Sequence, residues 1–173
     1  LIKKDIEVYF FARKKQIIDE ISRIGGKFTP DPGDISKFTK TCITNLPNTK
    51  DVENIIVGKN GIMNNLQAGS IVIDMSTISP EGTRHINHKL RAKKSFFIDA
   101  PVSGGEAGAK SGKLSIMVGG DKSAYLKIKF ILSILGSKIT YIGKSGSGQV
   151  CKACNQILVA QTIQSISEII IIA

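Results

Sequence analysis

The sequence predicts an α/β fold in which helices cover both faces of a doubly wound, mostly parallel sheet. Short runs of β-branched residues alternate along the chain with stretches of helical periodicity. Each run has the length of a strand and is flanked by polar or turn-forming residues, and no internal repeat is present. The expected strands are Glu7–Phe11, Thr41–Leu46, Ile71–Met75, Phe96–Val102, Leu114–Val118 and Ile139–Ile142.

The helices between these strands have recognisable ends. Lys14–Ile24 places its isoleucines on one face and stops at two glycines, a common signal for a helix C-terminus. Asp31–Pro32 and Ser79–Pro80 each put a capping side chain before a proline, which fits the first position of a helix. We expect the helix after Ser79–Pro80 to run to about Lys94 and another helix to span Lys122–Leu135.

The segment Gln149–Ala173 has no strand signal, and its apolar residues recur at helical spacing. Glutamines and a glutamate interrupt it, which excludes a membrane span. We therefore expect a Rossmann-like NAD(P)-binding domain over residues 1–146. Residues 147–173 are expected to begin a long interdomain helix that leads to a helical domain absent from this sequence.

Composition argues against a nucleic-acid-binding function and against a disulfide framework or metal site. The formal net charge is +10, but the lysines are scattered over every segment and aromatic residues are only 6% of the chain. A nucleic-acid-binding protein would cluster its basic residues and supply aromatics for stacking, so we interpret the lysines as a solvated surface. The electric field of these lysines would help to attract a small acidic substrate.

The three cysteines form no disulfide or metal-binding pattern, which favours a reducing, cytoplasmic setting.

The start of the expected sheet is incomplete. A dinucleotide fold places a G-x-G-x-x-G loop between its first strand and first helix, and no such loop occurs in this chain. If Glu7–Phe11 is the second strand, the first strand and phosphate loop lie upstream. The second strand is followed by Arg13, Lys14 and Lys15 and by no carboxylate. Basic residues there suit a 2′-phosphate and favour NADP over NAD, although the two lysines alternatively only open an exposed helix.

Two strand ends carry polar residues that packing does not require. Asp74–Pro80 brings hydroxyls to the carboxyl end of a strand, where ligands bind in open α/β sheets. Thr77 there could touch a nicotinamide ribose, or alternatively only help to cap the next helix. In Asp99–Gly105, Ser103 precedes two glycines that permit positive φ angles and close backbone approach to a ligand. Exposed N–H groups beside a hydroxyl would bind a carboxylate, and an ordinary turn is the alternative.

A third candidate site opens the last helix. The glycine-rich segment Gly143–Gly148 is followed by Lys152, Asn155 and Gln156, whose spacing puts all three side chains on one helix face. A lysine near the positive end of a helix is electrostatically disfavoured. Partial burial there would lower its pKa and suit it to proton transfer at a carbonyl oxygen. Solvation at the surface is the alternative for a lysine considered alone.

Taken together, these segments resemble the β-hydroxyacid dehydrogenase family over essentially the whole chain. The matching motifs are Ile73–Pro80, Asp99–Gly105 and Gly146–Gln149 with Lys152 and Asn155. Leu46–Pro47 also matches. The branch that the sequence resembles most is the tartronate semialdehyde (2-hydroxy-3-oxopropionate) reductases.

The resemblance implies roles for the matching residues. Lys152 would be the catalytic acid, and Asn155 would orient the reacting end of the substrate. The substrate carboxylate would be held by Ser103, Gly104 and Gly105. Leu46, Pro47 and Thr77 would line the NAD or NADP cofactor. The whole protein would be a homo-oligomer, a dimer or tetramer.

The resemblance implies hydride transfer between NAD(P)H and a small β-hydroxyacid or semialdehyde, with 2-hydroxy-3-oxopropionate the first choice of substrate. A 3-hydroxyisobutyrate dehydrogenase or a succinic semialdehyde or glyoxylate reductase remains open. A non-catalytic reader, or a fragment that is inactive by itself, is the alternative from another class.

Overall fold

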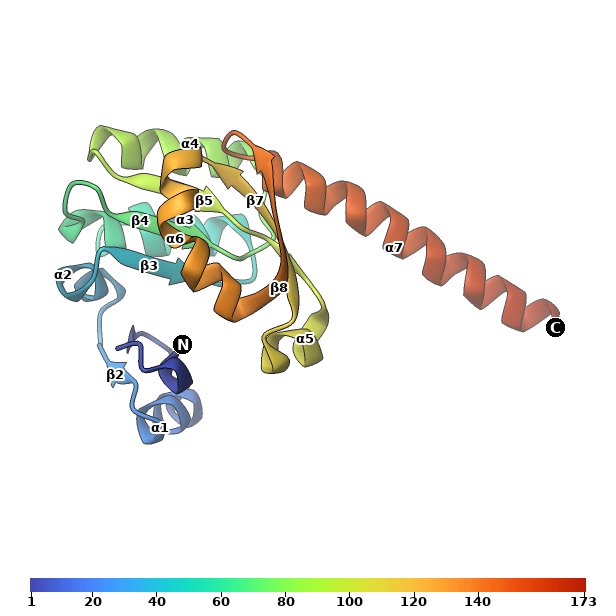
Figure 1. The fold of residues 1–173 in the computed structure, drawn as a ribbon, viewed down its shortest axis with the longest axis horizontal. Coiled ribbons are helices and arrows are strands. Elements are labelled where there is room, and N and C mark those ends of the chain that lie inside the picture. The colour runs from blue at the N-terminus through green and yellow to red at the C-terminus, as the bar shows by residue number, and fades with distance from the viewer.

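The computed structural model describes residues 1–173, and its body is a six-stranded sheet with helices on both faces (Figure 1). The strands are β3 (Thr41–Thr44), β4 (Ile71–Asp74), β5 (Phe96–Asp99), β6 (Val102–Ser103), β7 (Leu114–Gly120) and β8 (Gly136–Gly143). The helices are α1 (Lys15–Arg23), α2 (Ile35–Phe38), α3 (Thr49–Val57), α4 (Pro80–Ala92), α5 (Gly105–Ser111), α6 (Lys122–Leu135) and α7 (Ser147–Ile172). The chain also contains three short 3-10 helices: η1 (Ile2–Lys4), η2 (Pro32–Asp34) and η3 (Ile62–Asn65).

The sheet is mostly parallel, as the sequence predicts. β3, β4 and β5 are parallel neighbours, and β8 runs parallel to β7. β7 is antiparallel to both β5 and β6. The single strand expected over Phe96–Val102 is split into β5 and β6 at Ala100–Pro101. Proline has no N–H to donate to a ladder, and the Pro101 carbonyl instead accepts from the N–H of Met117 at 3.0 Å.

Two apolar clusters cover the two faces of the sheet. On one face, Ile71 and Ile73 of β4 pack with Leu132 and its neighbours on α6. On the other face, Val72 of β4 packs with residues of α3 and α4. All four residues of β4 are buried, as expected for a central strand covered on both sides. The doubly wound arrangement predicted from the sequence is therefore confirmed.

The first strand of the chain lies outside this sheet. β1 (Tyr9–Phe10) pairs in parallel with β2 (Lys27–Phe28), and the two form a separate sheet with no bond to β3. Figure 1 shows this unit, with α1 and the N-terminus, beside the main body. A cavity of about 430 Å³ lies between β1 and β3, and most of its lining side chains are apolar. The run expected at Glu7–Phe11 is thus a strand, but β3 is not its hydrogen-bonded neighbour.

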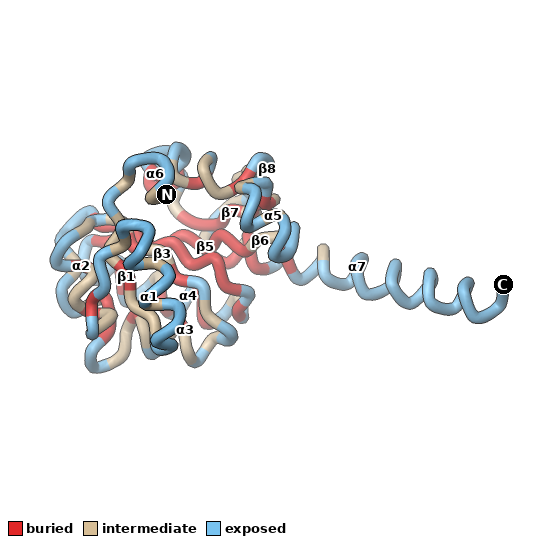
Figure 2. The backbone as a smooth tube through the Cα atoms, turned by 90° about the horizontal axis from the view of Figure 1, so that it is seen from below, coloured by how far each residue is buried: buried red, intermediate tan, exposed pale blue.

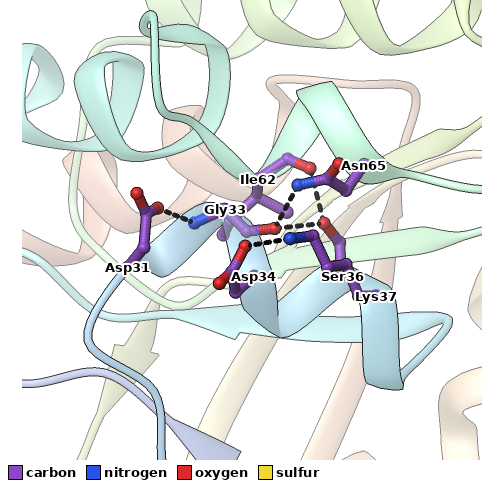
Figure 3. A network of polar contacts seen from close by, with 7 residues as sticks. All are labelled: Asp31, Gly33, Asp34, Ser36, Lys37, Ile62 and Asn65. Atoms are coloured by element: carbon purple, nitrogen blue, oxygen red, sulfur yellow. Dashed lines mark hydrogen bonds and ion pairs between the residues drawn. The ribbon is translucent and has the colours of Figure 1, made fainter.

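A polar network fixes the connection from β2 to β3 (Figure 3). The Asp31 carboxylate accepts from the N–H of Gly33 at 2.8 Å and caps η2, as the Asp31–Pro32 signal predicts. The Ser36 hydroxyl donates to the carbonyl of Ile62 at 2.8 Å, which ties α2 to η3. The amide of Asn65 donates to the Gly33 carbonyl at 3.0 Å. These bonds join two segments that lie about thirty residues apart in sequence.

The last helix leaves the body of the protein. α7 is buried only near its start, and every residue from Gln156 to the end is exposed (Figure 2). Its exposed side chains include a run of four isoleucines at Ile169–Ile172. No helix of the structure has the length and apolarity that a bilayer crossing requires.

The packing of α6 gives a matched pair of stability predictions. Leu132→Ala, at a fully buried position, should lower the free energy of unfolding by about 2–5 kcal/mol because it leaves a cavity. Leu126→Ala makes the same chemical change on the same helix at a position 59% exposed, and should cost within about 0.5 kcal/mol. Urea unfolding of both variants measures the difference. Equal losses would show that α6 does not pack as described.

Candidate active site

The carboxyl ends of three neighbouring parallel strands lie at one edge of the sheet. Thr44 of β3 is in register with Asp74 of β4, and Asp74 is in register with Asp99 of β5. The segments that leave this edge contain most of the residues singled out in the sequence. Ligands in open α/β sheets bind at this edge, and the geometry of each segment shows how it is held there.

A buried hydrogen-bond network joins the loops after β3 and β4. The N–H of Leu46 donates to the Ser76 hydroxyl at 2.8 Å, and that hydroxyl donates to Oδ1 of Asp74 at 2.6 Å. The Thr44 hydroxyl donates to the same carboxylate oxygen at 2.8 Å. Leu46 is half-buried and Pro47 is exposed. Asp74 therefore fixes the loop that contains Leu46 and Pro47, two of the predicted cofactor-lining residues.

The Asp74 carboxyl is an unusual group in this position. It is completely buried, and its Oδ2 atom has no hydrogen-bond partner. Burial raises its pKa above the ordinary range, since the hydrogen bonds from Ser76 and Thr44 offset only part of the desolvation. The neighbouring carboxylate of Asp99 adds to the rise in pKa.

Thr77 is presented to solvent by a clamp on either side of it. The side chain of Gln149 donates from Nε2 to the Ser76 carbonyl at 2.8 Å and accepts at Oε1 from the N–H of Ile78 at 3.2 Å. Gln149 is buried on α7, whereas the Thr77 side chain is exposed between two buried neighbours. Ser79 caps α4 by accepting from the N–H of Gly82 at 2.9 Å. The threonine is therefore not used as the helix cap.

The turn after β6 has the open backbone that the sequence predicts. Gly104 and Gly105 have φ angles of 132° and 61°, a region that other residues rarely adopt. Both glycines are exposed, and Ser103 is half-buried. The two glycines begin α5, and no side-chain cap occupies the N-terminus of that helix.

Lys152 is enclosed near the start of α7. It is only 8% exposed, and burial lowers the pKa of its ammonium group below the ordinary value for lysine. Its Nζ donates to Oε1 of Gln156 at 2.6 Å, and the Asn155 amide donates to the same oxygen at 3.2 Å. Gln156 was not assigned a role from the sequence, although its i, i+4 spacing from Lys152 was visible there.

Arg13 stands apart from the other predicted site residues. It is exposed just after β1, in the two-stranded sheet, and its guanidinium forms no side-chain hydrogen bond or ion pair. The structure thus ties together the segments of Leu46, Thr77 and Lys152, while Arg13 lies beyond this network. No cluster of three or more side chains suited to metal binding is present.

The exposed groups at this edge fit part of a dinucleotide cofactor. A free hydroxyl at Thr77 and an exposed loop at Leu46–Pro47 lie at the carboxyl ends of adjacent strands, where ribose and nicotinamide binding is expected. No protein group forms a hydrogen bond with the exposed Thr77 hydroxyl, which leaves it available to a ligand. A pyrophosphate would be held by a glycine-rich G-x-G-x-x-G loop, a pattern that does not occur in residues 1–173.

Comparison with known proteins agrees with this geometry. Residues 1–143 match the family described as the NAD binding domain of 6-phosphogluconate dehydrogenase. The chain belongs to this family. Curated relatives place it among the β-hydroxyacid dehydrogenases, as the resemblance of its motifs predicts.

Two curated relatives show the range of names within the family. The 2-hydroxy-3-oxopropionate reductase of Escherichia coli K12 is 36% identical over 157 residues, which are 91% of this chain and 54% of that protein. A probable mitochondrial 3-hydroxyisobutyrate dehydrogenase of Dictyostelium discoideum is 33% identical and aligns over 97% of this chain and 52% of its own. The chain therefore spans about half the length of the curated relatives that it matches.

Solved structures share the fold closely. A Mycobacterium tuberculosis 3-hydroxyisobutyrate dehydrogenase with L-serine superposes with a TM-score of 0.90 at 26% identity, covering 96% of this chain and 56% of that one. A protein named Psf3, in complex with NADP+ and 2-OPP, gives a TM-score of 0.89 at 27% identity, covering 97% of this chain and 61% of the other. The predicted Rossmann-like fold is confirmed.

The raised pKa of Asp74 predicts a pH-dependent stability. The unfolded chain releases the Asp74 proton at the ordinary pKa of an aspartate, whereas the folded chain retains it to higher pH. The free energy of unfolding should therefore fall as pH rises between these two pKa values and stay lower above them. Asp74→Asn, which cannot ionise, should reduce this fall.

Urea unfolding between pH 3 and pH 8 measures the effect, with Asp19→Asn on the exposed face of α1 as the control. An identical pH dependence in the wild-type protein and Asp74→Asn would mean that burial does not raise the pKa of this carboxyl.

Proposed function

We propose that this chain is the cofactor-binding part of an NAD(P)-dependent oxidoreductase and also supplies its catalytic acid. The reaction is the reduction of a small semialdehyde acid to a β-hydroxyacid, with 2-hydroxy-3-oxopropionate giving glycerate as the preferred pair. One observation supports this above the others: the enclosed ammonium of Lys152 lies on a helix that Gln149 ties to the backbone on either side of the exposed Thr77. This arrangement favours a proton donor close to the edge that we propose for cofactor binding.

The residues at the sheet edge would hold the nicotinamide half of the cofactor. Thr77 would bind its ribose, and Leu46 and Pro47 would pack against it. When bound, the cofactor supplies the hydride for the substrate carbonyl carbon. Arg13 is free to pair with a 2′-phosphate, which favours NADP over NAD.

Lys152 would donate the proton that completes the reduction. Burial lowers the pKa of Lys152 toward neutral pH. An acid whose pKa lies closer to the working pH transfers its proton more readily. Gln156 holds Nζ by a single acceptor oxygen, which leaves the other two protons of the ammonium available to a carbonyl oxygen. The N–H groups at Gly104 and Gly105, with the Ser103 hydroxyl, would bind the substrate carboxylate, and Asn155 would orient the reacting end.

The relatives favour one substrate without restricting the chain to it. The E. coli relative is named for 2-hydroxy-3-oxopropionate and the D. discoideum relative for 3-hydroxyisobutyrate. A substrate panel on the intact protein, with succinic semialdehyde and glyoxylate included, separates the candidates by kcat/KM.

We further propose a homo-oligomer whose contacts include the exposed apolar residues of α7. We also propose a cytoplasmic setting, in which the three cysteines stay as free thiols.

Lys152→Ala tests the catalytic assignment. Loss of a general acid should lower kcat by about 10²–10⁴-fold, while the dissociation constant of NADPH stays nearly unchanged. Steady-state kinetics and fluorescence titration of NADPH with the intact protein give the two quantities. Lys138→Ala, at an exposed lysine of β8, is the control and should match the wild-type protein.

Retention of most of the wild-type kcat by Lys152→Ala would refute the acid role. If no semialdehyde in the panel is reduced although NADPH binds, a non-catalytic role is favoured instead. In the active protein, kcat/KM for reduction should fall as pH rises through the pKa of Lys152, which lies below the ordinary lysine value.

Arg13→Ala tests the cofactor preference. Removing the guanidinium should weaken NADP+ binding by about tenfold, because one charge-assisted contact to phosphate is lost, and should leave NAD+ binding nearly unchanged. Isothermal titration of both cofactors measures the ratio, with Arg23→Ala at the end of α1 as the control. Equal weakening for both cofactors would remove the basis for the NADP preference.

A further inference from the structure

The start of α7 is capped by a carboxylate from another part of the fold. Asp99, at the end of β5, is completely buried. Its Oδ1 accepts from the N–H of Gly146 at 2.8 Å, and its Oδ2 accepts from the N–H of Gln149 at 3.2 Å. α7 has no side-chain cap from its own N-cap residue. The Asp99 carboxyl group instead accepts from one N–H at the N-cap and one in the first turn of this 26-residue helix.

Two glycines make room for this carboxylate. A Cβ atom at Gly119 of β7 would lie 2.5 Å from Oδ2 of Asp99. A Cβ atom at Gly148 of α7 would lie 2.8 Å from the same oxygen and 2.4 Å from the carbonyl oxygen of Met117. With any residue other than glycine at these two positions, the backbone of α7 could not approach the sheet this closely. The two glycines therefore define the geometry of the contact between α7 and the sheet.

The contact joins the two segments to which substrate chemistry is assigned. Asp99 lies four residues before Ser103, and the chain between them is held to β7 by the Pro101 carbonyl. On the other side, Lys152 lies one helical turn after Gly148. A shift of the α7 start relative to β5 would move the ammonium of Lys152 by the same amount, because the helix between them is rigid.

We propose that Asp99 is a positioning residue, which sets the distance between the Lys152 ammonium and the Ser103–Gly105 turn without itself touching substrate or cofactor. The proposal rests on the function proposed above for Lys152. Misplacement of a reacting group by about 1 Å can cost about 10²-fold in rate. The same carboxylate would be dispensable for catalysis if it served only to stabilise the fold.

Asp99→Asn tests the proposal in the intact protein. The amide keeps the size of the side chain but places an NH2 group against one of the two N–H donors. We expect kcat to fall by about 10²-fold, with KM and NADPH affinity changing much less. Gly148→Ala should reproduce the loss, because its Cβ would clash with the Met117 carbonyl and with the Asp99 carboxyl group and so displace the start of α7.

A second readout does not depend on activity. In protein labelled with ¹³C-lysine, the Cε–Hε resonance of Lys152, assigned with Lys152→Arg, follows the protonation of its ammonium group. Burial lowers the pKa of this lysine. In Asp99→Asn and Gly148→Ala its titration midpoint should move toward the ordinary lysine value as the ammonium loses its enclosure.

Asp121→Asn is the matched control for this readout. Asp121 also caps a helix, because its Oδ1 accepts from the N–H groups of Ser123 and Ala124 at the start of α6, but it has no bond to α7. It should leave the Lys152 titration unchanged. If Asp99→Asn and Gly148→Ala leave both kcat and the Lys152 titration at wild-type values, the proposal is overturned.

The outcomes also separate this proposal from the proposed function. An inactive Lys152→Ala beside a fully active Asp99→Asn would refute the positioning role alone. An active Lys152→Ala, with a shifted Lys152 titration in Asp99→Asn, would refute the acid role and leave the positioning contact established.

Discussion

Parallel strands bring their carboxyl ends to one edge of a sheet, but they do not fix the loops that follow. In this protein, buried polar side chains hold those loops in place. Asp74 holds the loop after β3, Gln149 holds the loop after β4, and Asp99 holds the start of α7. A buried polar group is costly unless its partners are in place. Each of these contacts therefore favours one arrangement of the loops over many that apolar packing alone would permit.

The local elements could be predicted because their signals lie within a few residues. The bounds of α6 match the expected Lys122–Leu135, since its cap and its apolar period are adjacent in sequence. The cap at Ser79–Pro80 was predicted for the same reason. The break in the strand expected over Phe96–Val102 was not predicted, although Pro101 lies at the break and proline disfavours a continuous strand. The separate β1–β2 sheet depends on pairing between distant segments, which periodicity does not report.

The site was predictable in its residue types and less so in its connections. The enclosed state of Lys152 agrees with the expectation from its place near a helix start. The clamp around Thr77 spans more than seventy residues of sequence, and no spacing rule relates Gln149 to it. The role of Gly119 is equally hidden, because it shows only as the space that a carboxylate from another strand occupies.

The cavity between β1 and β3 has a consequence for how this chain behaves in solution. β3 is the last strand of its sheet, so one of its edges has no neighbouring strand, and its residues line the mostly apolar cavity. Such an edge is a template for any extended apolar peptide that fits beside it. Pairing of this edge between copies of the chain would therefore promote aggregation at high protein concentration.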